Sequence, residues 1–173
     1  FVLRNVLGMG TVAYTAVFGL CGATVTVTIA VAASLVRRFS QARQVRVGLI
    51  AGLVVDTVFA GVCLTWLREP VTGPERMPLL VAVVALFLAH VACLGLSMGN
   101  APALALDRTG RWAGTGSALL GFLQFVIGGL VSPLVGLTGE ASGAAFGVGI
   151  VAVGAGANIL AVFGLRERGE KQR

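Results

Sequence analysis

Charged residues are scarce in this chain. Only 12% of the 173 residues are Asp, Glu, Lys or Arg, whereas 57% are hydrophobic, and soluble domains carry roughly 25% charged residues. A water-soluble globule cannot cover so much apolar surface with so few polar side chains. The composition therefore excludes an ordinary soluble domain and indicates that a lipid bilayer is the solvent.

Clusters of metal-binding or disulfide-forming residues are also missing. Cys21, Cys63 and Cys93 each stand alone in a different apolar stretch, and the chain has a single histidine. Because there is no CxxC spacing and no second histidine, neither a zinc site nor a disulfide framework is indicated. We interpret the cysteines as small hydrophobic side chains and expect no metal and no cofactor.

Motifs for catalysis and nucleotide binding are absent or out of context. The sequence has no GxSxG elbow, no HExxH and no P-loop. Residues 8–13 and 147–152 match a loose G-x-G-x-x-A fingerprint, but that fingerprint binds dinucleotides only after a strand in a βαβ unit. The net charge of +6 comes largely from arginines between the apolar stretches. We therefore expect neither an enzyme nor a nucleic-acid-binding protein.

Long apolar stretches dominate what is present. Each is long enough for a helix to cross the hydrocarbon core, which takes ~20 residues. Short polar segments separate them, and a charged tail at residues 166–173 follows the last one. We predict an all-α integral membrane protein with five transmembrane helices, at about 13–36, 45–67, 78–106, 115–137 and 144–165.

The start of the chain does not resemble a targeting signal. Residues 1–12 are too short to span a bilayer, and no charged n-region precedes an apolar h-region. We expect these residues to form an external loop or the stub of a preceding helix. The sequence is interpreted as a carboxyl-terminal fragment of a longer protein.

The arginines predict the orientation in the membrane, because Lys and Arg in short loops remain on the cytoplasmic side. Five spans divide the basic residues ten to three between the two faces. We therefore expect a multi-pass protein of the inner (plasma) membrane with a cytoplasmic carboxyl terminus. The ten are Arg37, Arg38, Arg43, Arg46, Arg108, Arg111, Arg166, Arg168, Lys171 and Arg173, and the three are Arg4, Arg68 and Arg76.

Small residues recur at helical spacing in two of the predicted spans. Gly19 begins such a series in the first span, and Ser117, Gly121 and Gly128 form one in the fourth. Small side chains let membrane helices approach closely. These positions are therefore predicted to lie at helix–helix contacts.

Two ionisable residues lie near the middle of predicted spans, Asp56 in the second and His90 in the third. A charge at that depth costs at least ~2.5–3.5 kcal/mol, so it is expected to face a partner or a cavity. Both are candidates for a substrate or proton pathway. The alternative is a hydrogen bond between helices that has no role in transport.

Uncharged amides form a second group of polar candidates. Asn100, Gln124 and Asn158 lie in apolar runs and need hydrogen-bond partners where water is absent. For Asn158 we expect a helix-to-helix hydrogen bond. Asn100 and Gln124 are pathway candidates, because Pro102 is predicted to bend the helix beside Asn100 and bent helices build transport sites. Pro133 interrupts the fourth span in the same way.

Two longer segments resemble a known family. Residues 99–106 (GNAPALAL) and 110–124 (GRWAGTGSALLGFLQ), together with residues 1–3 (FVL) and the basic segment 35–43, are similar to Bcr/CflA-type drug:proton antiporters of the major facilitator superfamily. The resemblance covers essentially the whole chain and makes the five spans the eighth to twelfth helices of that family. Ser40 departs from its pattern, in which a glycine is usual.

The resemblance implies alternating access, in which two six-helix bundles rock about a site near mid-membrane and proton entry drives drug export. The partners implied are the amino-terminal half of the transporter, a drug-like small molecule, protons and the lipid bilayer. Arg37, Arg38, Arg108 and Arg111 would lie at cytoplasmic gating contacts. Their alternative role is only to set the topology.

Two other readings remain open on the sequence. The chain could be a five-helix membrane scaffold or subunit that associates through its glycine-rich faces without transporting anything. A membrane-embedded enzyme using His90 and Asp56 would need a further nucleophile or metal ligand at the same depth, and the sequence offers none.

Overall fold

The structure is a computed structural model that describes the backbone of residues 2–67, 71–107, 109–137 and 143–170. Side chains are described within these ranges except at 2, 5, 131–137, 143–145 and 163–170. The predicted loops around Arg68, Arg108 and residues 138–142, and the side chains of Pro133, Arg166 and Arg168, therefore lie outside the described residues.

The described backbone is helical apart from turns and short connecting segments. A π-helical turn, Val2–Val6, precedes α1 (Thr11–Leu35), α2 (Gln41–Trp66), α3 (Arg76–Met98) and α4 (Asn100–Leu106). A 3₁₀ turn, Gly110–Trp112, then leads into α5 (Ala113–Leu137), and α6 (Gly143–Glu170) follows. The predicted all-α class agrees with this part of the chain.

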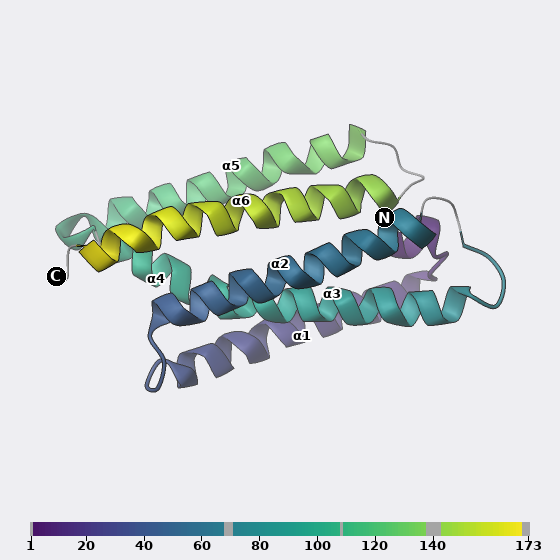
Figure 1. Cartoon of the computed structure of the whole chain (residues 1–173), viewed down its shortest axis with the longest axis horizontal. Helices are drawn as coiled ribbons and strands as arrows, with labels where there is room; N and C mark the ends of the chain where they lie inside the picture. The colour runs from purple at the N-terminus through teal and green to yellow at the C-terminus, as the bar shows by residue number, and fades with distance from the viewer. Residues whose placement is uncertain (1, 68–70, 108, 138–142, 171–173) are drawn as a thin grey trace.

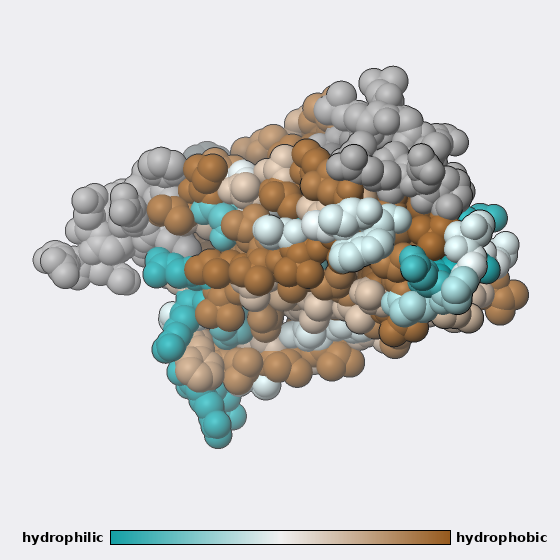
Figure 2. Space-filling model, turned by 45° about the vertical axis from the view of Figure 1, so that its right-hand side comes forward, coloured by the Kyte–Doolittle hydropathy of each residue, from teal (hydrophilic) through white to brown (hydrophobic). Residues whose placement is uncertain are grey.

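Four of the helical segments are long and apolar enough to cross a membrane. They are Thr11–Leu35, Gln41–Trp66, Arg76–Leu106 and Gly110–Leu130, and α6 contributes a shorter apolar stretch, Phe146–Val162, among the described residues. Brown apolar side chains run along the molecule and teal polar ones gather at its ends (Figure 2). Such a distribution is consistent with a membrane helical bundle.

The helices lie roughly side by side along the long axis (Figure 1). α2 packs against α6 on one side and α3 on the other, and α1 packs against α3. The α1–α2 turn and the start of α5 lie at one end, here called the arginine end, which carries the exposed side chains of Arg37, Arg38 and Arg111. The amino terminus lies at the opposite end.

The third predicted span is divided in the structure. α3 ends at Met98, and α4 begins at Asn100 after Gly99. Pro102 lies in the first turn of α4 and has no N–H to donate to the carbonyl oxygen of Met98, four residues before it, where α3 ends. The interruption therefore precedes the proline, and it brings Asn100 to the start of a new helix.

Ser40 caps the amino-terminal end of α2. In the antiporter family that the sequence resembles, a glycine is usual at this position. The Ser40 hydroxyl accepts a hydrogen bond from the backbone N–H of Arg43 at 3.3 Å. A serine at this position stabilises a helix start because it satisfies one of the unpaired N–H groups.

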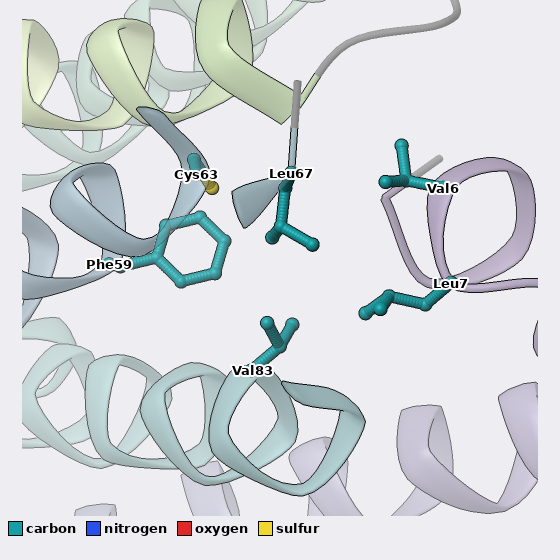
Figure 3. Close-up of a cluster of buried hydrophobic side chains, with 6 residues drawn as sticks. All are labelled: Val6, Leu7, Phe59, Cys63, Leu67 and Val83. Carbon is teal, nitrogen blue, oxygen red and sulfur yellow. The ribbon is translucent and has the colours of Figure 1, made fainter. Parts of the chain in front are cut away.

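A cluster of buried apolar side chains lies near the amino terminus, at the end opposite the arginine end, and Figure 3 shows its six members close together. Phe59, Cys63 and Leu67 come from α2 and the residue that follows it, and Val83 comes from α3. Val6 and Leu7 of the amino-terminal segment complete the group, which we call the apolar cluster. Arg76 holds that segment in place, since its guanidinium donates to the carbonyl oxygens of Leu7 and Gly8 at 2.7 and 2.6 Å.

The glycines with the least space around them are not the ones that we predicted from the sequence to lie at helix–helix contacts. A Cβ added to Gly19, Gly121 or Gly128 would meet no described atom within 4 Å, and Ser117 is exposed. Their packing role stays a prediction. The tight contacts are instead at Gly48, Gly95, Gly116, Gly147 and Gly154.

Candidate functional site

Asp56 and His90 meet between α2 and α3. Asp56 Oδ1 and His90 Nδ1 are 2.5 Å apart, and the two side chains are 5% and 21% exposed. Both residues lie near the middle of apolar helices, as the sequence indicated. The structure therefore joins the two ionisable residues into one hydrogen-bonded pair, which the sequence could not show.

Glycines bring α3 this close to α2. Gly48, Gly52 and Asp56 follow each other at intervals of four residues, so they lie on one face of α2. A Cβ on Gly48 would lie 2.9 Å from the carbonyl oxygen of Cys93, and one on Gly52 would lie 3.6 Å from Cys93 Cβ. The GxxxG spacing of Gly48 and Gly52 was the signal in the sequence for this contact.

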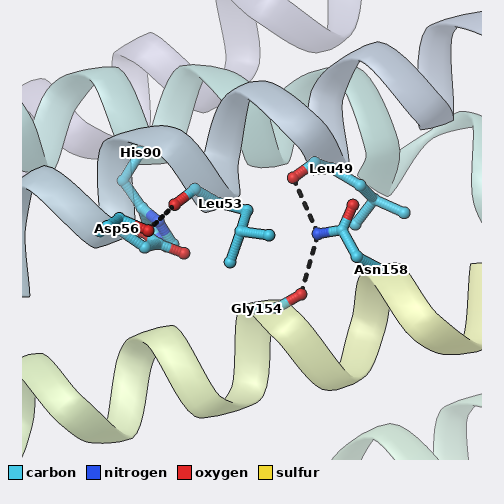
Figure 4. A network of polar contacts seen from close by, with 7 residues as sticks. Leu49, Leu53, Asp56, His90, Gly154 and Asn158 are labelled. Carbon is cyan, nitrogen blue, oxygen red and sulfur yellow. Dashed lines mark hydrogen bonds and ion pairs between the residues drawn. The ribbon is translucent and has the colours of Figure 1, made fainter.

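α6 closes the site from the other side of α2 (Figure 4). A Cβ on Gly154 would lie 2.9 Å from Asp56 Oδ2, so only glycine leaves room for that oxygen here. One turn further, the Asn158 amide donates to the carbonyl oxygens of Leu49 and Gly154 at 3.0 and 2.9 Å. The expected helix-to-helix hydrogen bond of Asn158 is confirmed.

A cavity of about 350 Å³ lies between α2, α3 and α6. Its wall includes Asp56 and His90, and it extends along α2 to Gly48. Most of the lining is apolar, with Cys93, Ser97 and Asn158 as the other polar side chains. The Ser97 side chain is 9% exposed, and its hydroxyl has no hydrogen-bond partner among the described residues. A buried hydroxyl in such a wall is available to a water molecule or a ligand.

A second polar contact lies about three helical turns from the Asp56–His90 pair, toward the arginine end. The Asn100 amide donates to Gln44 Oε1 at 3.2 Å and to the Leu96 carbonyl at 2.9 Å, and both amide residues are 5% exposed. Turning the Gln44 amide over would instead place its nitrogen 3.0 Å from the Ala32 carbonyl oxygen. In either orientation Gln44 links α2 to a neighbouring element.

Sequence reasoning missed Gln44 and Ser97. Gln44 falls one residue before the predicted span, and Ser97 is a small polar residue of a kind that membrane helices tolerate by bonding to their own backbone. The available signal was their spacing, because Gln44 precedes Gly48 by four residues and Ser97 follows His90 by seven. Both positions therefore share a helix face with the pair.

The remaining predicted site residues lie elsewhere. Gln124 is exposed on α5 and does not line the cavity. Arg37, Arg38 and Arg111 are exposed at the arginine end, and the Arg111 guanidinium lies 5.2 Å from the centre of the Trp112 ring. Arg108 lies outside the described residues.

The pair can share or exchange a proton, because a carboxyl and an imidazole in direct contact are a matched acceptor and donor. Among the described residues, no group of three His, Cys, Asp or Glu side chains is placed to hold a metal ion. The chemistry of these residues is therefore that of a protonatable pair in an apolar cavity.

Comparison with known proteins points to a transporter superfamily. The chain is 27% identical over 169 residues to the uncharacterised MFS-type transporter YdgK of Bacillus subtilis. The alignment covers 95% of this chain and 38% of that protein, so the chain spans well under half the length of the relative. No family model and no solved structure matches the chain. The similarity to YdgK supports membership in the major facilitator superfamily.

Proposed function

We propose that this chain is the carboxyl-terminal part of a secondary transporter of the major facilitator superfamily that exports small amphiphilic, drug-like molecules in exchange for protons. The observation that carries the proposal is the Asp56–His90 pair, which lies near mid-span beside a cavity. The similarity to an MFS-type transporter and the drug-antiporter resemblance of residues 99–106 and 110–124 support it.

The pair suits proton coupling for an energetic reason. A charge near the bilayer centre costs ~2.5–3.5 kcal/mol, so gain or loss of one proton changes the stability of a conformation by a comparable amount. A transporter alternates between conformations that differ by a few kcal/mol. Protonation of Asp56 and His90 is therefore large enough in energy to bias that equilibrium.

The proposal includes the rest of the transporter. Because the chain corresponds to 38% of the relative, an amino-terminal bundle supplies the other side of the transport pathway. The arginine end faces the cytosol of a plasma membrane, as the ten-to-three distribution of basic residues favours. Arg37, Arg38 and Arg111 then lie where the two bundles and the lipid headgroups meet.

Drug export by the full-length protein with Asp56→Asn tests the proposal. The substitution keeps the size of the side chain and removes its ability to exchange a proton. We expect the rate of proton-driven dye and drug efflux from cells to fall by about an order of magnitude or more, equivalent to at least ~1.4 kcal/mol. The amount of folded protein in the membrane should change much less.

The matched control is Glu75→Gln. Glu75 is an exposed carboxylate just before α3, far along the helix from the cavity, so its neutralisation is expected to leave efflux unchanged. Efflux by Asp56→Asn equal to that of the unmodified protein at matched expression would contradict a proton-coupling role.

The alternative of a non-transporting membrane scaffold has one observation in its favour. A Cβ added to Gly19, Gly121 or Gly128 would meet no described atom within 4 Å, so these positions leave room for another helix, and small residues at such positions promote helix association. The same efflux measurement in cells distinguishes the two functions. A scaffold confers no efflux on cells that express the full-length protein, whereas a transporter does.

A further inference from the structure

The surroundings of the Asp56–His90 pair differ between its two sides. Toward the arginine end, the facing surfaces of α2 and α3 carry glycines and polar groups at successive turns. On α2 these are Gly52, Gly48 and Gln44, and on α3 and α4 they are Cys93, Ser97 and Asn100. Gln44 lies twelve residues before Asp56, a distance of ~18 Å along the helix.

Water fits along part of this polar side, as far as Gly48 and Ser97. The cavity of about 350 Å³ extends from Asp56 to Gly48, and a water molecule takes ~30 Å³ in the liquid. Ser97 offers a hydroxyl with no partner among the described residues. A buried water needs such polar partners to remain in an otherwise apolar space.

Aromatic and aliphatic side chains close the other side of the pair. Phe59 follows Asp56 by three residues, and its ring centre lies 6.4 Å from that of Phe87 and 6.0 Å from that of Phe146. Phe87 precedes His90 by three residues, and the two ring centres are 6.4 Å apart. Phe59 is itself a member of the apolar cluster, whose other members surround it in Figure 3.

The fully buried side chains on this side offer water almost no hydrogen bonding. The polar side chains near them, Tyr14 and Cys21, line a second cavity on the α1 side that Phe59 and Val83 also border. Cys63 and Leu67 have no exposed surface, and Val83 is 1% exposed. Water or a proton that entered from this end would lose its hydrogen bonds without replacement.

We infer that in this conformation the Asp56–His90 pair exchanges protons with the arginine end alone, through water held along Ser97 and the Gln44–Asn100 contact, while the apolar cluster seals the opposite end. The inference rests on the proposed transport function and adds the side from which protons arrive.

One other titratable group lies along this route among the described residues. Cys93 of α3 is the one further titratable side chain in the cavity wall, and α6 presents none between Phe146 and Val162. On α1, which packs against α3, Tyr14 and Cys21 line a separate cavity beside Phe87. Arg43 and Arg46 are exposed near the start of α2, at the arginine end.

Two native cysteines make the inference testable, because Cys93 lies in the cavity wall and Cys63 lies in the apolar cluster. Full-length proteins that keep only Cys93 or only Cys63 are placed in membrane vesicles of both orientations. A small, membrane-impermeant methanethiosulfonate reagent is then added outside, and the rate of thiol modification is measured.

We expect Cys93 to react about tenfold or more faster from the arginine end than from the opposite end, since modification needs water at the thiol. Cys63 should react slowly from both. Faster reaction of Cys93 from the opposite end, or equal rates for Cys63 and Cys93, would overturn the inference.

A blocking variant tests the route itself. Gly48→Val places a side chain against Ser97 Oγ, which a Cβ at that position would already approach to 2.6 Å. It should slow modification of Cys93 severalfold, whereas the control Gly61→Val on the same helix adds its side chain where no described atom lies within 4 Å. Equal rates in the two variants would overturn the route. If Gly48→Val does not fold, the sidedness of Cys93 decides the question.

The labelling outcome is separate from the outcome of the export test. Loss of export in Asp56→Asn combined with labelling of Cys93 from the opposite end would leave the proposed function standing and reject the proton route. Normal export in Asp56→Asn combined with labelling from the arginine end would reject coupling at Asp56, while the water path would stand.

Discussion

At the scale of single residues, the Asp56–His90 contact explains how two ionisable groups are accommodated in apolar helices. Each side chain supplies the partner that the other needs, at 2.5 Å, and Gly154 leaves space for the second carboxylate oxygen. Burial makes the pair sensitive to the loss of one member, because the remaining group is left without compensation.

A double-mutant cycle measures this dependence. His90→Leu should lower the free energy of unfolding of the purified protein by up to ~3–5 kcal/mol, because it leaves a buried charge without its partner. Adding Asp56→Leu should recover part of that loss, because no unpaired carboxyl then remains. Strictly additive losses in the double variant would mean that the two side chains do not interact.

The sequence predicted the main residues of the site, but it predicted only part of how they are arranged. Asp56 and His90 are conspicuous because ionisable residues are rare in apolar runs. Their contact, and the roles of Gln44 and Ser97, depend on which helices are neighbours and on how each is rotated. A single sequence contains no direct signal for either.

At the scale of helices, glycines set the distance between neighbours. The contact of α1 with α3 passes through Gly95, where an added Cβ would overlap the Thr28 side chain. The Thr28 hydroxyl is already bonded to the carbonyl oxygens of Thr24 and Val25 at 2.8 and 3.0 Å. The threonine side chain therefore has little freedom to move aside.

Gly95→Ala should consequently destabilise the protein. Overpacking costs ~1–3 kcal/mol, which exceeds the gain of up to ~1 kcal/mol that alanine brings to a helix. The matched control is Gly22→Ala on α1, where no described atom lies within 4 Å of the new methyl group. We expect a lower melting temperature for Gly95→Ala alone, and partial recovery when Thr28→Ala is added. Equal melting temperatures for Gly95→Ala and Gly22→Ala would show that this contact is absent.

Hydropathy predicted the helices better than it predicted their contacts. The predicted second span, 45–67, compares with α2 at Gln41–Trp66, and the predicted first span, 13–36, with α1 at Thr11–Leu35. The series at Gly19 and Gly121 were predicted to be contact faces, and a Cβ added at either glycine would meet no described atom within 4 Å. Small residues show where another helix can approach closely, but they do not show which helix does so.

At the scale of the whole molecule, the surface is that of a protein surrounded by apolar material. Phe18, Phe125 and Leu160 are 70%, 84% and 73% exposed along the helices, and the polar side chains lie toward the ends (Figure 2). Lipid or other apolar helices must cover these side chains, because soluble proteins rarely expose so much contiguous apolar surface to water. In the proposed mechanism, the orientation of the two ends decides from which compartment a proton reaches Asp56.

Cysteine labelling of intact cells tests this account most directly. In a full-length protein without its native cysteines, Arg38→Cys reports on the arginine end and Glu75→Cys on the opposite end; both positions are exposed. A membrane-impermeant maleimide added outside the cells should label Glu75→Cys at once and Arg38→Cys only after the membrane is permeabilised. Labelling of Arg38→Cys in intact cells, with Glu75→Cys protected, would contradict the account.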